Sequence, residues 1–189
     1  MTTINVDQFG RAVIDWAGRR GGQFASNWPV KGGWEGWIQV DLTAHILSAD
    51  SAIDILREQP VFANSRQRCD LLLNTNQMPA HQIVVELKAQ SFDNRDRFIT
   101  GVESDLDKFN TLDYAYQRST CVMLAMPFSP ESLAELLGVE RSGHRIFQTI
   151  FIGEVACAVA IRTADHGWLS PNQVPAPQAT GVLTTPVLP

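Results

Sequence analysis

Apolar residues recur along the chain with two spacings, one typical of helices and the other of strands. Helical spacing over residues 6–20 predicts an N-terminal helix, which the glycines of GRRGG are expected to end. A second helical pattern covers residues 34–48, and residues 48–59 predict a short helix or an extended arm. The first third of the chain is therefore expected to be mainly helical.

Strand patterns begin in the middle of the chain. The segment SRQRCDLLLNTN predicts a short strand, and QIVVELKAQS predicts a second strand that forms an antiparallel hairpin with it. The later patterns predict a loop and helix over residues 91–119, a buried strand over 120–128, a helix over 129–139 and one long strand or a strand pair over 146–163. This order is typical of an α/β protein with a central sheet and helices on its faces.

Composition limits the organisation of the chain and its general class. The 189 residues are 44% hydrophobic and 19% charged, which predicts a packed globular domain, assigned here to residues 1–169. Residues 170–189 are rich in proline and predict an extended tail. The net charge of −5 argues against a protein that coats nucleic acid by charge alone, because that affinity comes mainly from lysine and arginine.

The cysteines and the N-terminal residues bear on location. Cys69, Cys121 and Cys157 are too few and too scattered for a disulfide framework or a zinc site, so we expect them to be small buried residues. The first residues, MTTINVDQFG, show no basic segment followed by an apolar one, and no apolar run is long enough to span a membrane. The expectation is a soluble cytoplasmic protein.

Charged side chains interrupt the strand QIVVELKAQS. Because side chains alternate across a strand, Glu86, Lys88 and Gln90 share one face, and the preceding strand carries Asp70. Buried charges without partners are costly. A divalent cation held by the two carboxylates, with Lys88 in hydrogen-bonding reach, would compensate them. The alternative is an ordinary ion pair between Glu86 and Lys88 on a solvated sheet face.

The segments RCDLLL and VVELKAQ together resemble the active-site signature of the PD-(D/E)xK, or restriction-endonuclease-like, nucleases. Glu35, in GGWEGWIQVDL, occupies the place of the helix glutamate that this family commonly carries upstream. The resemblance covers about residues 34–126 and implies a mixed sheet flanked by helices, with an αβββαβ core. That core requires one further strand, which SRQ or the region before it is expected to supply.

The resemblance also implies roles for individual residues. Asp70 and Glu86, with the carbonyl of Leu87, would bind Mg²⁺ or Mn²⁺, and Glu35 would bind a second metal or a metal-bound water. Lys88 would orient or activate the attacking water or stabilise charge on the phosphate, and Gln90 would position Lys88 or the phosphate. The implied activity is metal-dependent hydrolysis of nucleic acid, with DNA expected, and a homodimer or a protein partner is expected to provide targeting.

Other charged residues have simpler interpretations. Arginines on either side of the candidate site are candidates for phosphate contacts, the alternative being dispersed surface charge: Arg66, Arg68, Arg95 and Arg97. The mixed helix face of Glu103, Asp105, Asp107 and Lys108 is expected to be solvated. The rival function is a catalytically inactive binding or interaction module of the same fold, such as an immunity or assembly protein, which the acidic net charge would suit.

Overall fold

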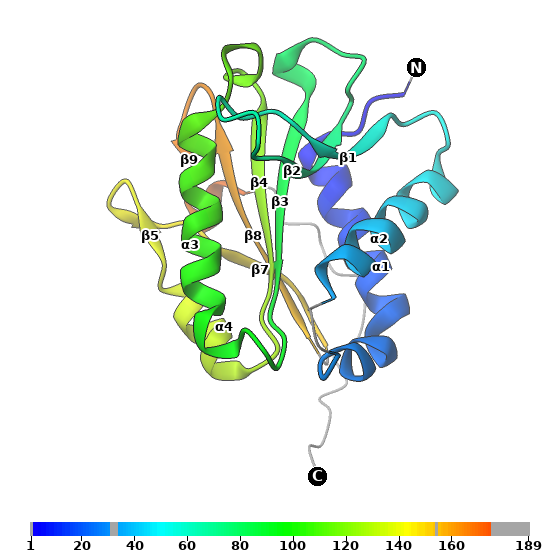
Figure 1. Ribbon diagram of the computed structural model, residues 1–189, viewed down its shortest axis with the longest axis vertical. Coiled ribbons are helices and arrows are strands. Elements are labelled where there is room, and N and C mark those ends of the chain that lie inside the picture. The colour runs from blue at the N-terminus through cyan, green and yellow to red at the C-terminus, as the bar shows by residue number, and fades with distance from the viewer. Residues whose placement is uncertain (1, 31–33, 154, 175–189) are drawn as a thin grey trace.

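The computed structural model describes residues 2–30, 34–153 and 155–174, in which a mixed sheet lies between two pairs of helices (Figure 1). The α-helices are α1 (Val6–Asn27), α2 (Glu35–Ala49), α3 (Phe98–Lys108) and α4 (Pro130–Leu137). The strands are β1 (Ile55–Gln59), β2 (Cys69–Leu73), β3 (Ile83–Ala89), β4 (Thr120–Met126), β5 (Glu140–Arg141), β6 (His144–Arg145), β7 (Gln148–Ile152), β8 (Ala156–Thr163) and β9 (Gly167–Trp168). Short 3₁₀ turns cover Pro79–His81, Arg95–Arg97, Phe109–Thr111, Tyr114–Tyr116 and Pro171–Gln173.

The main sheet has seven strands in the order β1-β2-β3-β4-β8-β7, with β9 paired to β8. Strands β1, β2 and β3 are antiparallel neighbours, and the chain then crosses through α3 to β4, which runs parallel to β3. Strands β8 and β7 continue the sheet in antiparallel pairing, while β5 and β6 form a separate hairpin. The predicted α/β class is confirmed, and the order α2-β1-β2-β3-α3-β4 matches the αβββαβ order that the family resemblance implies.

The two faces of the sheet bury separate hydrophobic clusters. Helices α1 and α2 cover the face that contains Val85 and Leu87 of β3, whereas α3 and α4 cover the face that contains Val84 (Figure 1). Glu86 and Lys88 share one face of β3, as predicted from the alternation of side chains along the strand, and the structure shows that this face is turned toward α3. The helix that follows β3 therefore faces the charged residues of that strand.

Helix α1 is longer than predicted. It begins with a capping box at Asn5 and continues through the glycines of GRRGG to Asn27. The ring of Phe24 is fully buried, 5.3 Å from Trp16 and 5.4 Å from Trp34 between ring centroids. The three glycines of GRRGG cost roughly 1 kcal/mol each relative to alanine, and burial of one aromatic side chain offsets a large part of this. Tertiary packing therefore overrides the local stop signal.

The expectation of a helix or arm over residues 48–59 is wrong. Residues 55–59 form the edge strand β1, whose side chains alternate between half-buried and exposed and whose neighbour is β2. This is the additional strand that the αβββαβ core requires, and it comes from the region before SRQ. Propensity gave little indication of it, because only one side of an edge strand is packed.

The C-terminal boundary also differs from the prediction. Pro171–Gln173 form a 3₁₀ turn, and Val174 is buried against the α1 and α2 face of the sheet, so the folded body continues past residue 169. Residues 175–189 of the predicted tail lie outside the described residues.

The three cysteines are buried as expected, and burial raises the pKa of each thiol to about 12. Within the described ranges, every helix is too short or too polar to cross a bilayer.

Candidate active site

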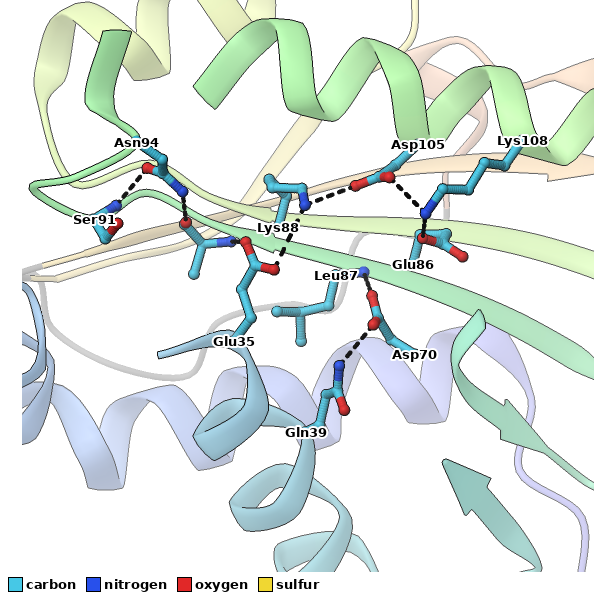
Figure 2. Close-up of polar contacts among 11 residues, drawn as sticks. Glu35, Gln39, Asp70, Glu86, Leu87, Lys88, Ser91, Asn94, Asp105 and Lys108 are labelled. Carbon is cyan, nitrogen blue, oxygen red and sulfur yellow. Dashed lines mark hydrogen bonds and ion pairs between the residues drawn. The ribbon is translucent and has the colours of Figure 1, made fainter. Parts of the chain in front are cut away.

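Asp70 lies where strands β2 and β3 separate. The two strands pair from Leu73–Ile83 to Leu71–Val85. At the next position the Asp70 carboxylate accepts a hydrogen bond from the backbone N–H of Leu87 at 2.5 Å, so the side chain takes the place of a strand partner. Its other oxygen accepts from the Gln39 side chain of α2 at 2.6 Å (Figure 2). Asp70 is thus fixed at the opening between the strands.

Glu86 is the most deeply buried acid of the cluster. The residue is 1% exposed, and its Oε2 lies 2.8 Å from the Lys108 ammonium of α3. Its Oε1 is buried and has no hydrogen-bond partner. A buried carboxylate oxygen without a donor is costly, so this atom marks a place where the site lacks a cation or a donor.

Lys88 connects β3 to the two helices on either side. Its ammonium lies 3.0 Å from Asp105 of α3 and 3.5 Å from Glu35 of α2 (Figure 2). Asp105 also lies 2.7 Å from the Lys108 ammonium, so it bridges both lysines. The alternative of a solvated pair between Glu86 and Lys88 is wrong, because Glu86 is buried and each residue has a different ion-pair partner.

Glu35 occupies the first turn of α2, at the mouth of the cluster. Its side chain is 30% exposed, and its second oxygen accepts from the backbone N–H of Ala89 at 3.2 Å. The upstream helix glutamate therefore lies at the end of β3 that carries Lys88, with partners on that strand.

Behind Asp70, a polar chain reaches the edge of the sheet. The Oε1 of Gln39 accepts from the Arg57 guanidinium of β1 at 2.8 and 3.2 Å, while its amide nitrogen donates to Asp70. Arg57 thereby fixes the orientation of the amide, because an amide that accepts from Arg57 presents its donor to Asp70. Sequence reasoning identified neither Gln39 nor Arg57.

Burial makes these acids weak. Burial raises the pKa of Glu86 to about 8, with a further rise from Asp70 and an opposing effect from Lys108. Burial raises the pKa of Asp70 to about 6 against the lowering effect of the Leu87 N–H, and it also raises the pKa of Glu35. Lys108 has its pKa raised by Glu86 and Asp105, which outweigh the opposing effect of burial. Burial is thus the main cause of the raised pKa of all three acids, and Lys108 offsets only part of it at Glu86.

The side chains present fit a divalent cation by charge and by donor type. Glu35, Asp70, Glu86 and Asp105 face Lys88 and Lys108, an excess of two negative charges when all are ionised. Carboxylate oxygens are the donors that Mg²⁺ and Mn²⁺ prefer. Within the described ranges, no three Asp, Glu, His or Cys side chains converge as a preformed metal cluster. The lysine ammoniums lie between the acids instead.

This electrostatic arrangement predicts how the metal-free protein responds to pH. Glu86 and Asp70 keep their protons in the folded state at pH values where the unfolded chain has lost them, so the free energy of unfolding falls as pH rises from about 4.5 to about 8. We expect a loss of several kcal/mol in EDTA, measured by urea unfolding across this range. Glu86→Gln is the control and should show a clearly shallower fall. Wild-type stability that stays level or rises with pH would contradict the assignment.

Gln90 is buried, but its hydrogen bonds go to the start of α4. Its side chain donates to Ser132 at 2.7 Å and accepts from the backbone N–H groups of Phe128 and Ser129 at 2.7 and 3.1 Å. The expected role in positioning Lys88 therefore has no support in these contacts, and Gln90 instead fixes the β4–α4 connection. For Leu87 the structure defines the N–H contact to Asp70, and metal binding by its carbonyl stays a prediction.

The four arginines considered for phosphate binding are all exposed: Arg66, Arg68, Arg95 and Arg97. Arg68 donates to the backbone carbonyl of Glu58, and Arg95 lies over the ring of Phe92 and beside Asp96. Arg95 and Arg97 lie in the 3₁₀ turn that follows β3 after residues 90–94. Their exposure suits either phosphate contact or ordinary surface charge.

Asp105 and Lys108 were expected to be solvated, and this expectation is wrong. Asp105 is 5% exposed and its carboxylate lies in the cluster, whereas Glu103 and Asp107 of the same helix are exposed. The helical period explains the difference, because positions 105 and 108 are three residues apart and share the face toward β3. The spacing D-x-x-K was the available signal, although nothing in it shows which face of α3 meets the sheet.

Comparisons with known proteins give no additional assignment. No protein-family model, curated protein or solved structure matches the chain. The arrangement of the cluster is therefore the basis for any functional conclusion.

Proposed function

We propose that the protein is a metal-dependent nuclease that hydrolyses phosphodiester bonds, with DNA as the expected substrate. The observation that carries the proposal is the buried cluster itself, in which Glu86 has an oxygen without a partner and acids outnumber lysines. The order of elements and the positions of Asp70, Glu86 and Lys88 support it further, since they agree with the PD-(D/E)xK pattern.

Asp70 and Glu86 are assigned as the ligands of a divalent cation. They extend from neighbouring strands, and the charge of Asp70 contributes to the raised pKa of Glu86, so the two carboxylates act on each other. A bound divalent cation supplies charge stabilisation to the phosphate and lowers the pKa of water. Gln39 and the Leu87 N–H hold the Asp70 carboxylate in place.

Lys88 is assigned to the phosphate and the attacking water. Its side chain is 22% exposed, which leaves a route for a substrate. Asp105 and Glu35 hold it at the edge of the cluster, and burial lowers its pKa less than these acids raise it. Lys88 therefore remains a cation, which favours stabilisation of negative charge over proton abstraction.

A cleavage assay tests the proposal directly. The purified protein should nick supercoiled plasmid and cut linear duplex DNA in Mg²⁺ or Mn²⁺ and should do neither in EDTA. Single-stranded DNA and RNA are included to define the substrate class. Absence of cleavage of every substrate with both metals would reject the nuclease and favour the inactive binding or interaction module. A homodimer or a protein partner for targeting stays a prediction. Measurement of the molecular mass in solution, with and without DNA, tests for the homodimer.

A further inference from the structure

Lys108 is the direct ion-pair partner of Glu86. It is the last residue of α3, and its ammonium lies 2.8 Å from Glu86 and 2.7 Å from Asp105 (Figure 2). No other lysine or arginine of the described residues makes an ion pair with Glu86. Lys108 therefore supplies the positive charge at the carboxylate that the proposed nuclease needs for its metal.

The compensation that Lys108 provides is incomplete. Its ammonium contacts only Oε2 of Glu86, and Oε1 stays buried without a partner. A divalent cation carries twice the charge of an ammonium and coordinates carboxylates through one or both oxygens. The two cations thus compete for one carboxylate, and the divalent cation matches its environment better.

Lys108 is able to leave, whereas Glu86 is not. The Lys108 side chain is 25% exposed and has a flexible four-carbon stem, while the Glu86 side chain is 2% exposed on a central strand. An ammonium turned outward also stays near the C-terminal end of α3, where the helix dipole favours positive charge. Movement of the lysine is therefore the simplest way to open Glu86.

We propose that Lys108 is a built-in counter-ion of Glu86, which neutralises this carboxylate in the metal-free protein and is displaced from it when a divalent cation binds. This inference rests on the proposed function, since it concerns the same metal-binding carboxylate. It makes Lys108 a positioning residue that sets metal affinity. Lys88 differs, because its ion pairs are with Glu35 and Asp105.

Calorimetric titration of the full chain with Mg²⁺, at one pH for all variants, tests the inference. Lys108→Met removes the competing charge and should tighten Mg²⁺ binding about tenfold or more. Lys108→Arg keeps the charge in a fork that holds carboxylates more firmly, so its affinity should equal the wild-type value or fall below it. The control is Arg141→Met, which removes a cation of the same 25% exposure that lies beside Glu103 and Asp107, and it should leave binding unchanged.

The outcomes separate the two proposals. If the wild type and all variants bind no divalent metal, the proposed metal-dependent function fails. If the wild type binds Mg²⁺ and Lys108→Met binds it equally or more weakly, the counter-ion role alone is overturned. Should Lys108→Met fail to fold, Lys108→Arg decides, because tighter binding by this variant contradicts competition.

Discussion

Glutamine in place of Glu86 is expected to lower metal-dependent cleavage by roughly a hundredfold or more, since a metal ion supplies several kcal/mol of transition-state stabilisation. The substitution removes the charge at the most buried acid of the cluster while keeping the shape of the side chain. Lys108 retains Asp105 as a partner at 2.7 Å, so no cation is left unpaired. The loss should appear in the rate of plasmid nicking under saturating Mg²⁺.

The matched control for this substitution is Glu103→Gln on helix α3. Glu103 has a side chain that is 48% exposed, and its ion pair with Arg141 is 3.9 Å long, so its removal should leave cleavage unchanged. Thermal unfolding of both variants separates catalysis from folding, with midpoints expected within a few degrees of wild type. Cleavage by Glu86→Gln at nearly the wild-type rate would remove Glu86 from the metal site.

Lys88→Met is expected to reduce cleavage by about 10²–10³-fold while leaving Mg²⁺ binding in place. The ammonium is the partly exposed cation at the mouth of the cluster, and methionine preserves the length of its stem without the charge. Both the cleavage rate and the calorimetric Mg²⁺ affinity should be measured on the same preparation of the variant. If Lys88 only stabilised the fold, Lys88→Met would lower the free energy of unfolding, and the folded molecules would still cleave DNA at the wild-type rate.

Lys88→Arg serves as the conservative comparison. It keeps a positive charge near Asp105 but changes the shape of the donor, so a partial recovery relative to methionine indicates that charge on the phosphate is what matters. Equal rates for wild type and Lys88→Met would exclude Lys88 from the chemistry.

The sequence predicted the parts of the fold in which local pattern and burial agree. Strands β2, β3 and β4 are rich in apolar residues that point to both faces of the sheet, and both faces are covered, so their patterns were clear. The edge strand β1 was missed because packing on one side leaves a weak signal, and α1 was predicted too short because Phe24 stabilises a segment with poor helix propensity. Neither fact can be seen in a local window of residues.

The candidate site divides in the same way. The spacing of Glu86 and Lys88 along one strand placed both on one face of the sheet, and adjacent strands brought Asp70 close by. Asp105, Lys108 and Gln39 could not be predicted as members, because membership depends on how helices rotate against the sheet. The position of Gln90 directly after β3 indicated a buried polar residue near the site. Its hydrogen bonds could not be predicted, because they depend on where α4 begins.

The structure explains why buried acids persist in this core. Asp70 and Glu86 raise the energetic cost of the metal-free fold as they ionise, and lysines from β3 and α3 offset part of that cost. Such an arrangement is poor for stability alone, since apolar residues would pack there without penalty. The arrangement favours binding of a divalent cation, because water screens the attraction between a cation and these carboxylates less than it would at the surface.

The most direct test of this account is the anomalous diffraction of crystals soaked with Mn²⁺. One Mn²⁺ peak is expected within about 2.3 Å of carboxylate oxygens from both Asp70 and Glu86, with the Lys108 ammonium moved away from Glu86. Absence of a peak at these two acids, with Lys108 still bound to Glu86 at high Mn²⁺ concentration, would contradict the central claim that this cluster is a metal site.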